Sequence, residues 1–261
     1  MSLNYTTAVR VSVGCAALLL MQPVQAAGFY ISEIGTPGSL GTAGVANPVN
    51  TVSADSSWTN PAGMTGLKQD EILAGMQVLA PKIEFDSSVA EAGGKDGGNA
   101  GNIAAIPAFF MVKKLSDRVR LGFSLVAPQG GAMSYGDDFV GRYGATKVSL
   151  AAIGGSPSIA YKVNDRLSLG GGVSIIYTQF EESVAINQSA LVPGPVPLPD
   201  GKVKFDNMTD LGYQPFVGLT YYLSDRSLSN DVERWRASAG VALFKEVGFT
   251  PFITQSLIAL Y

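Results

Sequence analysis

Residues 166–178 read "RLSLGGGVSIIYT", and their apolar and polar residues alternate as they do in a β-strand. One face is apolar, with Leu167, Leu169, Val173, Ile175 and Tyr177. The opposite face carries mostly small or hydroxyl residues, namely Ser168, Gly170, Gly172, Ser174 and Thr178. A half-buried strand usually places polar and charged residues on its water-facing side, and this face has no charge beyond Arg166 at its start. The segment therefore predicts a strand whose apolar face turns away from water.

Other segments along the chain repeat this alternation. Residues 118–127 and 211–224 alternate regularly, 71–85, 103–114 and 147–163 do so less cleanly, and 235–243 only weakly. Several of these segments reach the roughly 9–11 residues that a tilted transmembrane strand needs. Aromatic residues near the strand ends fit the girdles of a membrane barrel: Phe109, Phe110, Tyr161, Tyr177, Tyr221 and Tyr222.

A short turn sequence occurs in three near copies, at 115–118 ("LSDR"), 163–166 ("VNDR") and 223–226 ("LSDR"). Asp and Asn favour tight turns, so we expect short turns at one edge of the strands. The connections at the other edge are long, at 86–102, 129–146 and 182–204. Short turns that alternate with long loops are typical of outer-membrane barrels.

We therefore expect an all-β protein, a transmembrane antiparallel β-barrel that is complete or lacks some strands. The alternative is a soluble, secreted β-sandwich, whose strands also alternate. The composition argues against the sandwich, because charged residues make up 15% of the chain and about 25% of an average soluble domain. Hydrophobic residues make up 46% and glycine is frequent.

The residue types also limit the chemistry. The chain has no histidine, and its one cysteine, Cys15, lies in the N-terminal stretch interpreted below as a signal peptide. The mature chain is therefore expected to lack imidazole catalysis, thiolate catalysis and His–Cys zinc sites. We expect no catalytic residue, no cofactor and no metal site, and the acids in "YGDDF" (135–139) and "FDNMTD" (205–210) are interpreted as solvated loop residues. There is no basic cluster, so nucleic acid is not an expected partner.

The first 26 residues have the features of a signal peptide. Arg10 supplies a positive charge, residues 11–21 ("VSVGCAALLLM") are apolar, and 24–26 ("VQA") fit a cleavage site. The apolar run is too short for the roughly 20 residues of a membrane-spanning helix. We expect the mature chain to start at Ala27.

The stretch after the signal peptide is rich in small and turn-forming residues and ends in "WTNPAGM" (58–64). It carries only two charges, Glu33 and Asp55, and Pro61 restricts its own backbone and that of Asn60. These features suit a compact plug inside a cavity. The alternative is an ordinary surface loop before the first strand.

This stretch resembles the hatch of the FadL-type outer-membrane transporters for long-chain fatty acids and aromatic hydrocarbons, with Asn60, Pro61 and Ala62 as the hatch motif. The segments "GRY" (141–143), "PSIAY" (157–161) and "LGYQPFVGLTYYLSD" (211–225) are similar to further stretches of that family. The resemblance covers about residues 27–226.

The resemblance implies an N-terminal lumenal hatch and passive uptake of hydrophobic molecules, most simply long-chain fatty acids or related hydrocarbons. It implies the outer membrane of a Gram-negative-type bacterium, contact with outer-membrane lipid and a monomer. Phe29 and Ile31 match positions that line the family's deeper pocket. Apolar loop residues would capture the ligand first, and the candidates are Val192, Val196, Leu198, Phe139 and Tyr143. Arg142, Lys147 and Arg120 are alternative partners for a carboxylate head group.

Four regions are expected: a signal peptide (1–26), a hatch (27–67), barrel strands with long external loops (68–226) and an atypical tail (227–261). The family's barrel has more strands than the roughly six that alternate before Arg226. The chain is then either a small self-closed barrel of eight strands or a truncated or frame-shifted family member. We favour truncation, because about eight strands leave no room for a plug of about forty residues.

The function therefore has alternatives. The chain could be a truncated member that does not transport, a general porin or a structural barrel. An outer-membrane phospholipase or protease is disfavoured by the absence of histidine.

Overall fold

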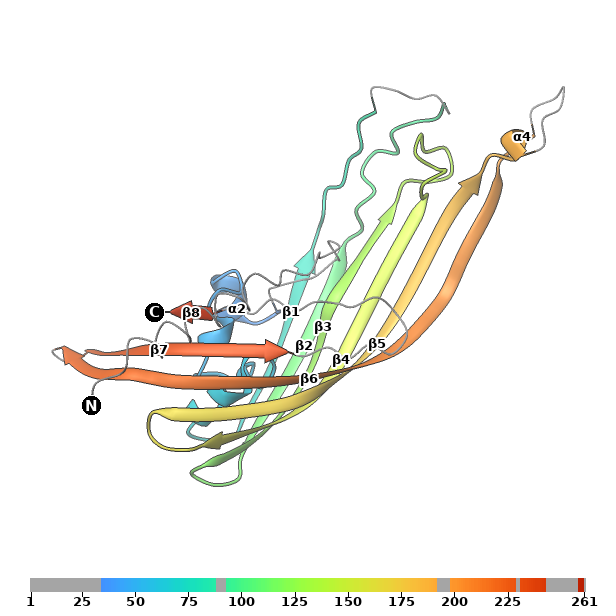
Figure 1. Ribbon diagram of the computed structural model, residues 1–261. Coiled ribbons are helices and arrows are strands. Elements are labelled where there is room, and N and C mark those ends of the chain that lie inside the picture. The colour runs from blue at the N-terminus through green and yellow to red at the C-terminus, as the bar shows by residue number, and fades with distance from the viewer. Residues whose placement is uncertain (1–33, 88–92, 192–197, 229–230, 243–257, 261) are drawn as a thin grey trace, which may run out of the picture.

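The computed structural model describes residues 34–87, 93–191, 198–228, 231–242 and 258–260. These form one sheet of eight strands in the order β1 to β8, in which every neighbouring pair is antiparallel. The strands are β1 (Glu71–Leu79), β2 (Ala104–Lys114), β3 (Val119–Ser134), β4 (Lys147–Lys162), β5 (Leu167–Ile186), β6 (Gly201–Leu228), β7 (Asp231–Ala242) and β8 (Ile258–Leu260). Among the described strands β1 and β8 are not paired with each other, so this part of the sheet is open (Figure 1).

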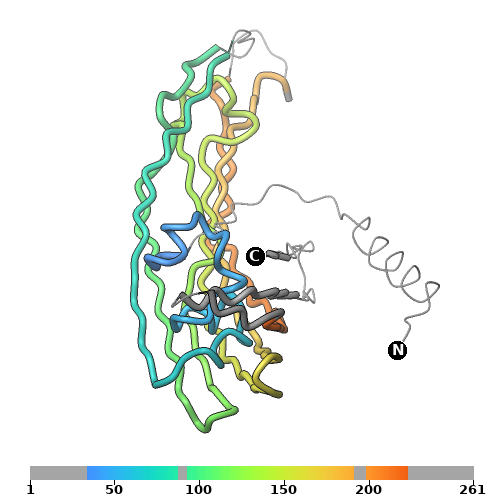
Figure 2. The backbone as a smooth tube through the Cα atoms, turned by 90° about the vertical axis from the view of Figure 1, so that its left-hand side faces the viewer, coloured from blue at the N-terminus to red at the C-terminus, as the bar shows by residue number. Residues whose placement is uncertain are grey.

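Residues 34–67, called the N-terminal segment below, fold as four short helical turns against the lower half of the sheet (Figures 1 and 2). These turns are α2 (Pro37–Gly41), η1 (Asn47–Val49), α3 (Ser56–Thr59) and η2 (Pro61–Gly66). A fifth short helix, α4 (Gln188–Leu191), precedes β6. None of the helices in the described ranges is long and apolar enough to cross a membrane.

Side-chain burial in the sheet is the reverse of that in a soluble protein. On β3 the polar side chains are buried, with Arg120 4% and Ser124 0% exposed, whereas Leu121 is 41% and Phe123 36% exposed. The exposed apolar rows continue on β4, β5 and β6. The face that carries the N-terminal segment, called the inner face below, thus buries many polar side chains together with an apolar cluster on β2 and β3, and the outer face is apolar. A soluble β-sandwich, the alternative considered above, would bury these apolar rows.

Two of the three predicted tight turns are confirmed. Leu115 N–H donates to the Val119 carbonyl at 3.1 Å between β2 and β3, and Val163 N–H donates to the Leu167 carbonyl at 3.0 Å between β4 and β5. The third prediction, a turn at 223–226, is wrong, because these residues lie inside β6. They pair with β7 after a bulge, and pairing with a neighbouring strand outweighs the local turn preference.

The strands extend further than their alternation predicts. Part of each expected loop at 129–146 and 182–204 is strand, because β3 reaches Ser134, β5 reaches Ile186 and β6 begins at Gly201. The acids of "FDNMTD" (205–210) lie in β6, not in a loop, and they are exposed as expected. These strand ends carry polar residues on both faces, so the apolar periodicity that marks a lipid-facing strand is absent there.

Candidate functional site

Asn60 fastens the N-terminal segment to the inner face of the sheet. Its side chain is fully buried, and Nδ2 donates to the Pro48 carbonyl at 2.8 Å and to the Leu219 carbonyl and Thr220 Oγ1, both at 3.3 Å. Its Oδ1 accepts from Ala62 N–H at 3.2 Å, which caps η2. The predicted motif residues Asn60, Pro61 and Ala62 therefore all lie buried against the sheet. A side-chain amide at this position satisfies buried backbone groups on both sides of the contact.

Three more hydrogen bonds fix the segment from below. Arg120 on β3 donates through Nε and Nη2 to the Leu67 carbonyl at 3.1 and 2.8 Å. Thr65 Oγ1 donates to Ser168 Oγ on β5 at 2.7 Å. The structure thus places Arg120, a candidate for the head group, beneath the N-terminal segment and next to the short turns.

A carboxylate lies at the centre of the N-terminal segment. Asp55 is 1% exposed, and Thr36 Oγ1 donates to its Oδ2 at 2.7 Å. Asn50 Nδ2 and Ser53 Oγ donate to its other oxygen. These neutral donors satisfy the buried oxygens, so Asp55 organises the fold of the segment.

An aromatic cluster lies at the other end of the strands, where the long loops meet. Phe139, predicted as a ligand-capturing residue, is 5% exposed and stacks on Tyr135 with 4.1 Å between ring centroids. Phe85 contacts the Phe139 ring edge to face at 5.4 Å. The cluster is an apolar contact that packs together two loops that are distant in the sequence.

Arg142 and Tyr143 lie beside this cluster and bind the same carboxylate. Arg142 Nε is 2.6 Å from Asp200 Oδ2, and Tyr143 Oη donates to Asp200 Oδ1 at 2.8 Å. Arg142 Nη1 also donates to the Gly93 carbonyl at 2.8 Å. The hydrogen bond from Arg142, and then that from Tyr143, lower the pKa of Asp200, and the same contact with Asp200 raises the pKa of Arg142. The pair has the geometry to hold a carboxylate, and in this structure Asp200 supplies it.

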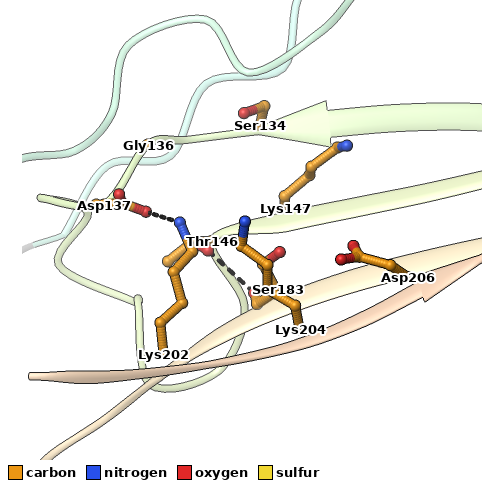
Figure 3. A pocket seen from close by; sticks show the side chains of 9 residues that line it. All are labelled: Ser134, Gly136, Asp137, Thr146, Lys147, Ser183, Lys202, Lys204 and Asp206. Atoms are coloured by element: carbon orange, nitrogen blue, oxygen red, sulfur yellow. Dashed lines mark hydrogen bonds and ion pairs between the residues drawn. The ribbon is translucent and has the colours of Figure 1, made fainter.

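A polar cavity of about 160 Å³ lies near the same rim (Figure 3). Lys147, the third head-group candidate, lines it and forms an ion pair with Glu181 at 2.8 Å. The full lining is Ser134, Gly136, Asp137, Thr146, Lys147, Ser183, Lys202, Lys204 and Asp206. This lining does not suit an apolar chain, because it would leave polar groups without water. In the described part of the chain no three His, Cys, Asp or Glu residues gather as a metal site.

The ladder between β2 and β3 is broken in its middle. Pairing ends at Phe109 with Leu125 and resumes as a single bridge between Gly101 and Met133. Between these points β2 is paired only with β1, and β3 is paired only with β4, except at Ala127 and Pro128, where the register of β3 and β4 shifts. Both free stretches contain a proline, Pro107 and Pro128, which has no N–H to donate to a ladder.

The lower edge of this break adjoins the N-terminal segment. Ala108, Phe110 and Val126 belong to the same hydrophobic cluster as Met64 and Leu67. The break is therefore next to the contact between the N-terminal segment and the sheet. Sequence reasoning could not locate it, because it depends on which residues fail to pair across two strands.

The remaining predicted ligand residues, Phe29 and Ile31, lie outside the described residues, as do Val192 and Val196. Leu198 is described and exposed. Sequence reasoning missed Tyr135, Phe85 and Asp200. The partner of Asp200 is 58 residues away in the chain, and no local pattern marks such a pair.

Comparison with known proteins supports the arrangement. The family described as "Outer membrane protein transport protein (OMPP1/FadL/TodX)" matches residues 17–228. "Outer membrane protein P1" of Haemophilus influenzae is 27% identical over 63% of this chain and 39% of its own length. The "Long-chain fatty acid transport protein" of Salmonella typhi is 23% identical over 81% of this chain and 51% of its own length. The chain thus spans about half the length of these relatives or less.

A solved structure is similar as well. A FadL homologue of Pseudomonas aeruginosa superimposes with a TM-score of 0.62 at 25% identity, and the match covers 82% of this chain and 52% of that one. The described sheet therefore has the strand arrangement of about half of such a barrel.

Proposed function

Since the chain belongs to the family of outer membrane transport proteins that includes FadL and TodX, we propose that it provides a passive path for hydrophobic molecules across that membrane. The molecules would be long-chain fatty acids or related hydrocarbons, in line with the name of the Salmonella typhi relative. The chain is an outer membrane protein of all-β fold, and relatives in its family are transport proteins. The N-terminal segment takes the part of the hatch.

The observation that carries this proposal is the break between β2 and β3. A molecule that leaves through it enters the lipid sideways and never crosses a hydrogen-bonded ladder. The rim suits an apolar chain, because the free stretch of β2 carries Ala104, Ala105, Ile106 and Pro107. Each CH₂ moved from water to such surroundings contributes about 0.8 kcal/mol, so binding needs no strong polar contact.

The path would begin at the aromatic cluster of Phe139, Tyr135 and Phe85. Arg142 and Tyr143 would hold the head group of a fatty acid in exchange for the Asp200 carboxylate, because one carboxylate can replace the other on the same donors. Phe29 and Ile31 would line the deeper pocket beside the N-terminal segment. The N-terminal segment would then shift to open the way to the break.

A cross-link across the break tests this path. Ala105→Cys and Gln129→Cys, in a Cys15→Ser background, are joined by a short bis-maleimide in protein reconstituted into vesicles. We expect uptake of a fluorescent long-chain fatty acid to fall to the protein-free level after cross-linking. The matched control is the same double variant capped with N-ethylmaleimide, which should keep its uptake.

Two outcomes would contradict the proposal. Equal uptake in the cross-linked and capped proteins would exclude the sideways path. No uptake above the protein-free level in the unmodified chain would exclude transport by this chain, and passage of a polar sugar instead would favour a general porin.

A further inference from the structure

The Asn60–Ala62 motif rests on two glycines of the sheet. Gly218 on β6 and Gly170 on β5 are direct partners in the ladder. They belong to a row of small residues across the inner face, in which Ala160 pairs with Gly170 and Gly240 pairs with Gly218. The row is a shallow notch, and the motif lies in it.

The fit in this notch leaves no room for a methyl group. A Cβ at Gly218 would lie 2.1 Å from Asn60 Oδ1 and 3.0 Å from Pro61 Cδ, and a Cβ at Gly170 would lie 2.5 Å from Ala62 N. Carbon atoms normally approach each other no closer than about 3.5 Å. The atoms in the way belong to the backbone and to a buried side chain, so they cannot rotate aside.

We propose that the Gly170–Gly218 pair is a positioning site that sets the closed position of the N-terminal segment. This inference rests on the proposed function, in which movement of that segment opens the path. The notch lets Asn60 come close enough to donate to the Leu219 carbonyl and Thr220 Oγ1. A side chain at either glycine pushes the motif off the sheet and weakens these bonds.

The displacement falls on the N-terminal segment because the sheet is the stiffer partner. Gly170 lies in β5, which pairs with β4 and β6, and Gly218 lies in β6, which pairs with β5 and β7. The N-terminal segment consists of helical turns of six residues or fewer. Moving such turns breaks a few side-chain bonds, whereas moving a central strand breaks two ladders at once.

The reactivity of an introduced thiol measures the displacement of the N-terminal segment without any transport assay. Ser57 is fully buried in the N-terminal segment, and its hydroxyl donates to the Phe123 carbonyl on β3 at 3.5 Å, so Ser57→Cys in a Cys15→Ser background should react slowly with a polar maleimide. The test variant is Gly218→Ala, and Gly170→Ala repeats it from the neighbouring strand. Gly212→Ala is the matched control on β6, since a Cβ there would meet only the Ile176 carbonyl oxygen at 3.9 Å.

We expect Gly218→Ala and Gly170→Ala to raise the labelling rate by about tenfold or more, while Gly212→Ala leaves it unchanged. Heat-modifiable gel mobility of the refolded chain in detergent shows in each case that the sheet is intact. Equal labelling of Gly218→Ala and Gly212→Ala in folded protein would overturn the proposal. Loss of the folded sheet in both test variants, with Gly212→Ala folded, would overturn it too, because the sheet would then be the part that yields.

The outcome is separable from that of the transport assay. Faster labelling without fatty acid uptake would support the positioning site and contradict the proposed function. Uptake with unchanged labelling would support the function and contradict the positioning site.

Discussion

Arg142 joins three segments that are far apart in the sequence. Its guanidinium binds Asp200 from the stretch before β6 and the Gly93 carbonyl from the stretch before β2. Its own carbonyl accepts from Ala185 N–H on β5 at 2.9 Å. The Arg142 side chain therefore helps to hold the rim loops together, beside the Lys202–Asp137 ion pair, and the charge state of Asp200 decides whether the Arg142–Asp200 contact holds.

The pH dependence of this contact follows from the pKa of Asp200. That pKa is lowered from 3.8 in the folded chain, so the carboxylate stabilises the loops above pH 3.8, and this contribution is lost as the pH falls through the lower, folded value. We expect the carboxyl ¹³C signal of Asp200 to titrate below 3.8. Arg142→Gln should move the midpoint back toward 3.8.

An Asp200 midpoint that is equal in the unmodified chain and in Arg142→Gln would show that Arg142 does not hold this carboxylate in solution.

The strands could be predicted from the sequence only in the segments where apolar and polar residues alternate. In 118–127 and 166–178 the apolar face is the exposed outer face, and the alternation predicts both the strand and its orientation. Beyond the membrane both faces of a strand are polar, so the ends of β3, β5 and β6 could not be predicted. The prediction of a turn at 223–226 was wrong because these residues pair with β7, and the local turn sequence gives no sign of that pairing.

The candidate site was predictable in its local part alone. Asn60, Pro61 and Ala62 form a compact motif that composition and turn chemistry single out. Their packing against Gly170 and Gly218 depends on residues that lie more than one hundred positions further along the chain. Such contacts leave no mark in a single sequence.

The turn between β4 and β5 gives a prediction at this scale. Asn164 Oδ1 accepts from Arg166 N–H at 2.9 Å and from Leu167 N–H at 2.8 Å. Asn164→Ala leaves these donors to water, and we expect it to lower the free energy of unfolding by about 1 kcal/mol. Urea unfolding of the refolded chain measures the change.

Asp165→Ala is the matched control in the same turn. Its side chain is 97% exposed and bonds only Lys162 among the contacts described, so we expect a change of less than about 0.5 kcal/mol. A loss in Asp165→Ala as large as that in Asn164→Ala would contradict the role given to Asn164.

The two faces of the sheet differ in polarity, as expected for a protein that contacts both lipid and water. Its outer face carries exposed apolar rows between the level of Tyr161 and that of Tyr177, and its inner face holds polar residues and the N-terminal segment. We expect lipid to cover the first face, and the N-terminal segment covers the lower half of the second. The destabilisation caused by a charged substitution on the outer face should therefore depend on how deep in the membrane the residue lies.

Val173 lies midway between these two levels on β5 and is exposed on the outer face. Val173→Arg places a charge near the centre of the membrane and should destabilise the chain by about 2–4 kcal/mol in lipid. Unfolding in bilayers by urea measures this. Gln179→Arg, on the same face but above Tyr177, should cost about 0–1 kcal/mol; equal losses in both variants would contradict the assignment of the outer face.

The length of β5 determines how far above the bilayer a dissolved solute first contacts the protein. Beyond Tyr177 this strand continues to Ile186 and stays paired with β6, which adds roughly 30 Å along the strand at about 3.3 Å per residue. At a tilt of about 45° the rim stands roughly 20 Å above the aromatic level. A dissolved solute thus collides with a rigid rim in bulk water before it reaches the bilayer. For a molecule taken up from water as proposed above, we expect the rate of arrival at this rim to follow its free aqueous concentration, and not how well it partitions into the membrane.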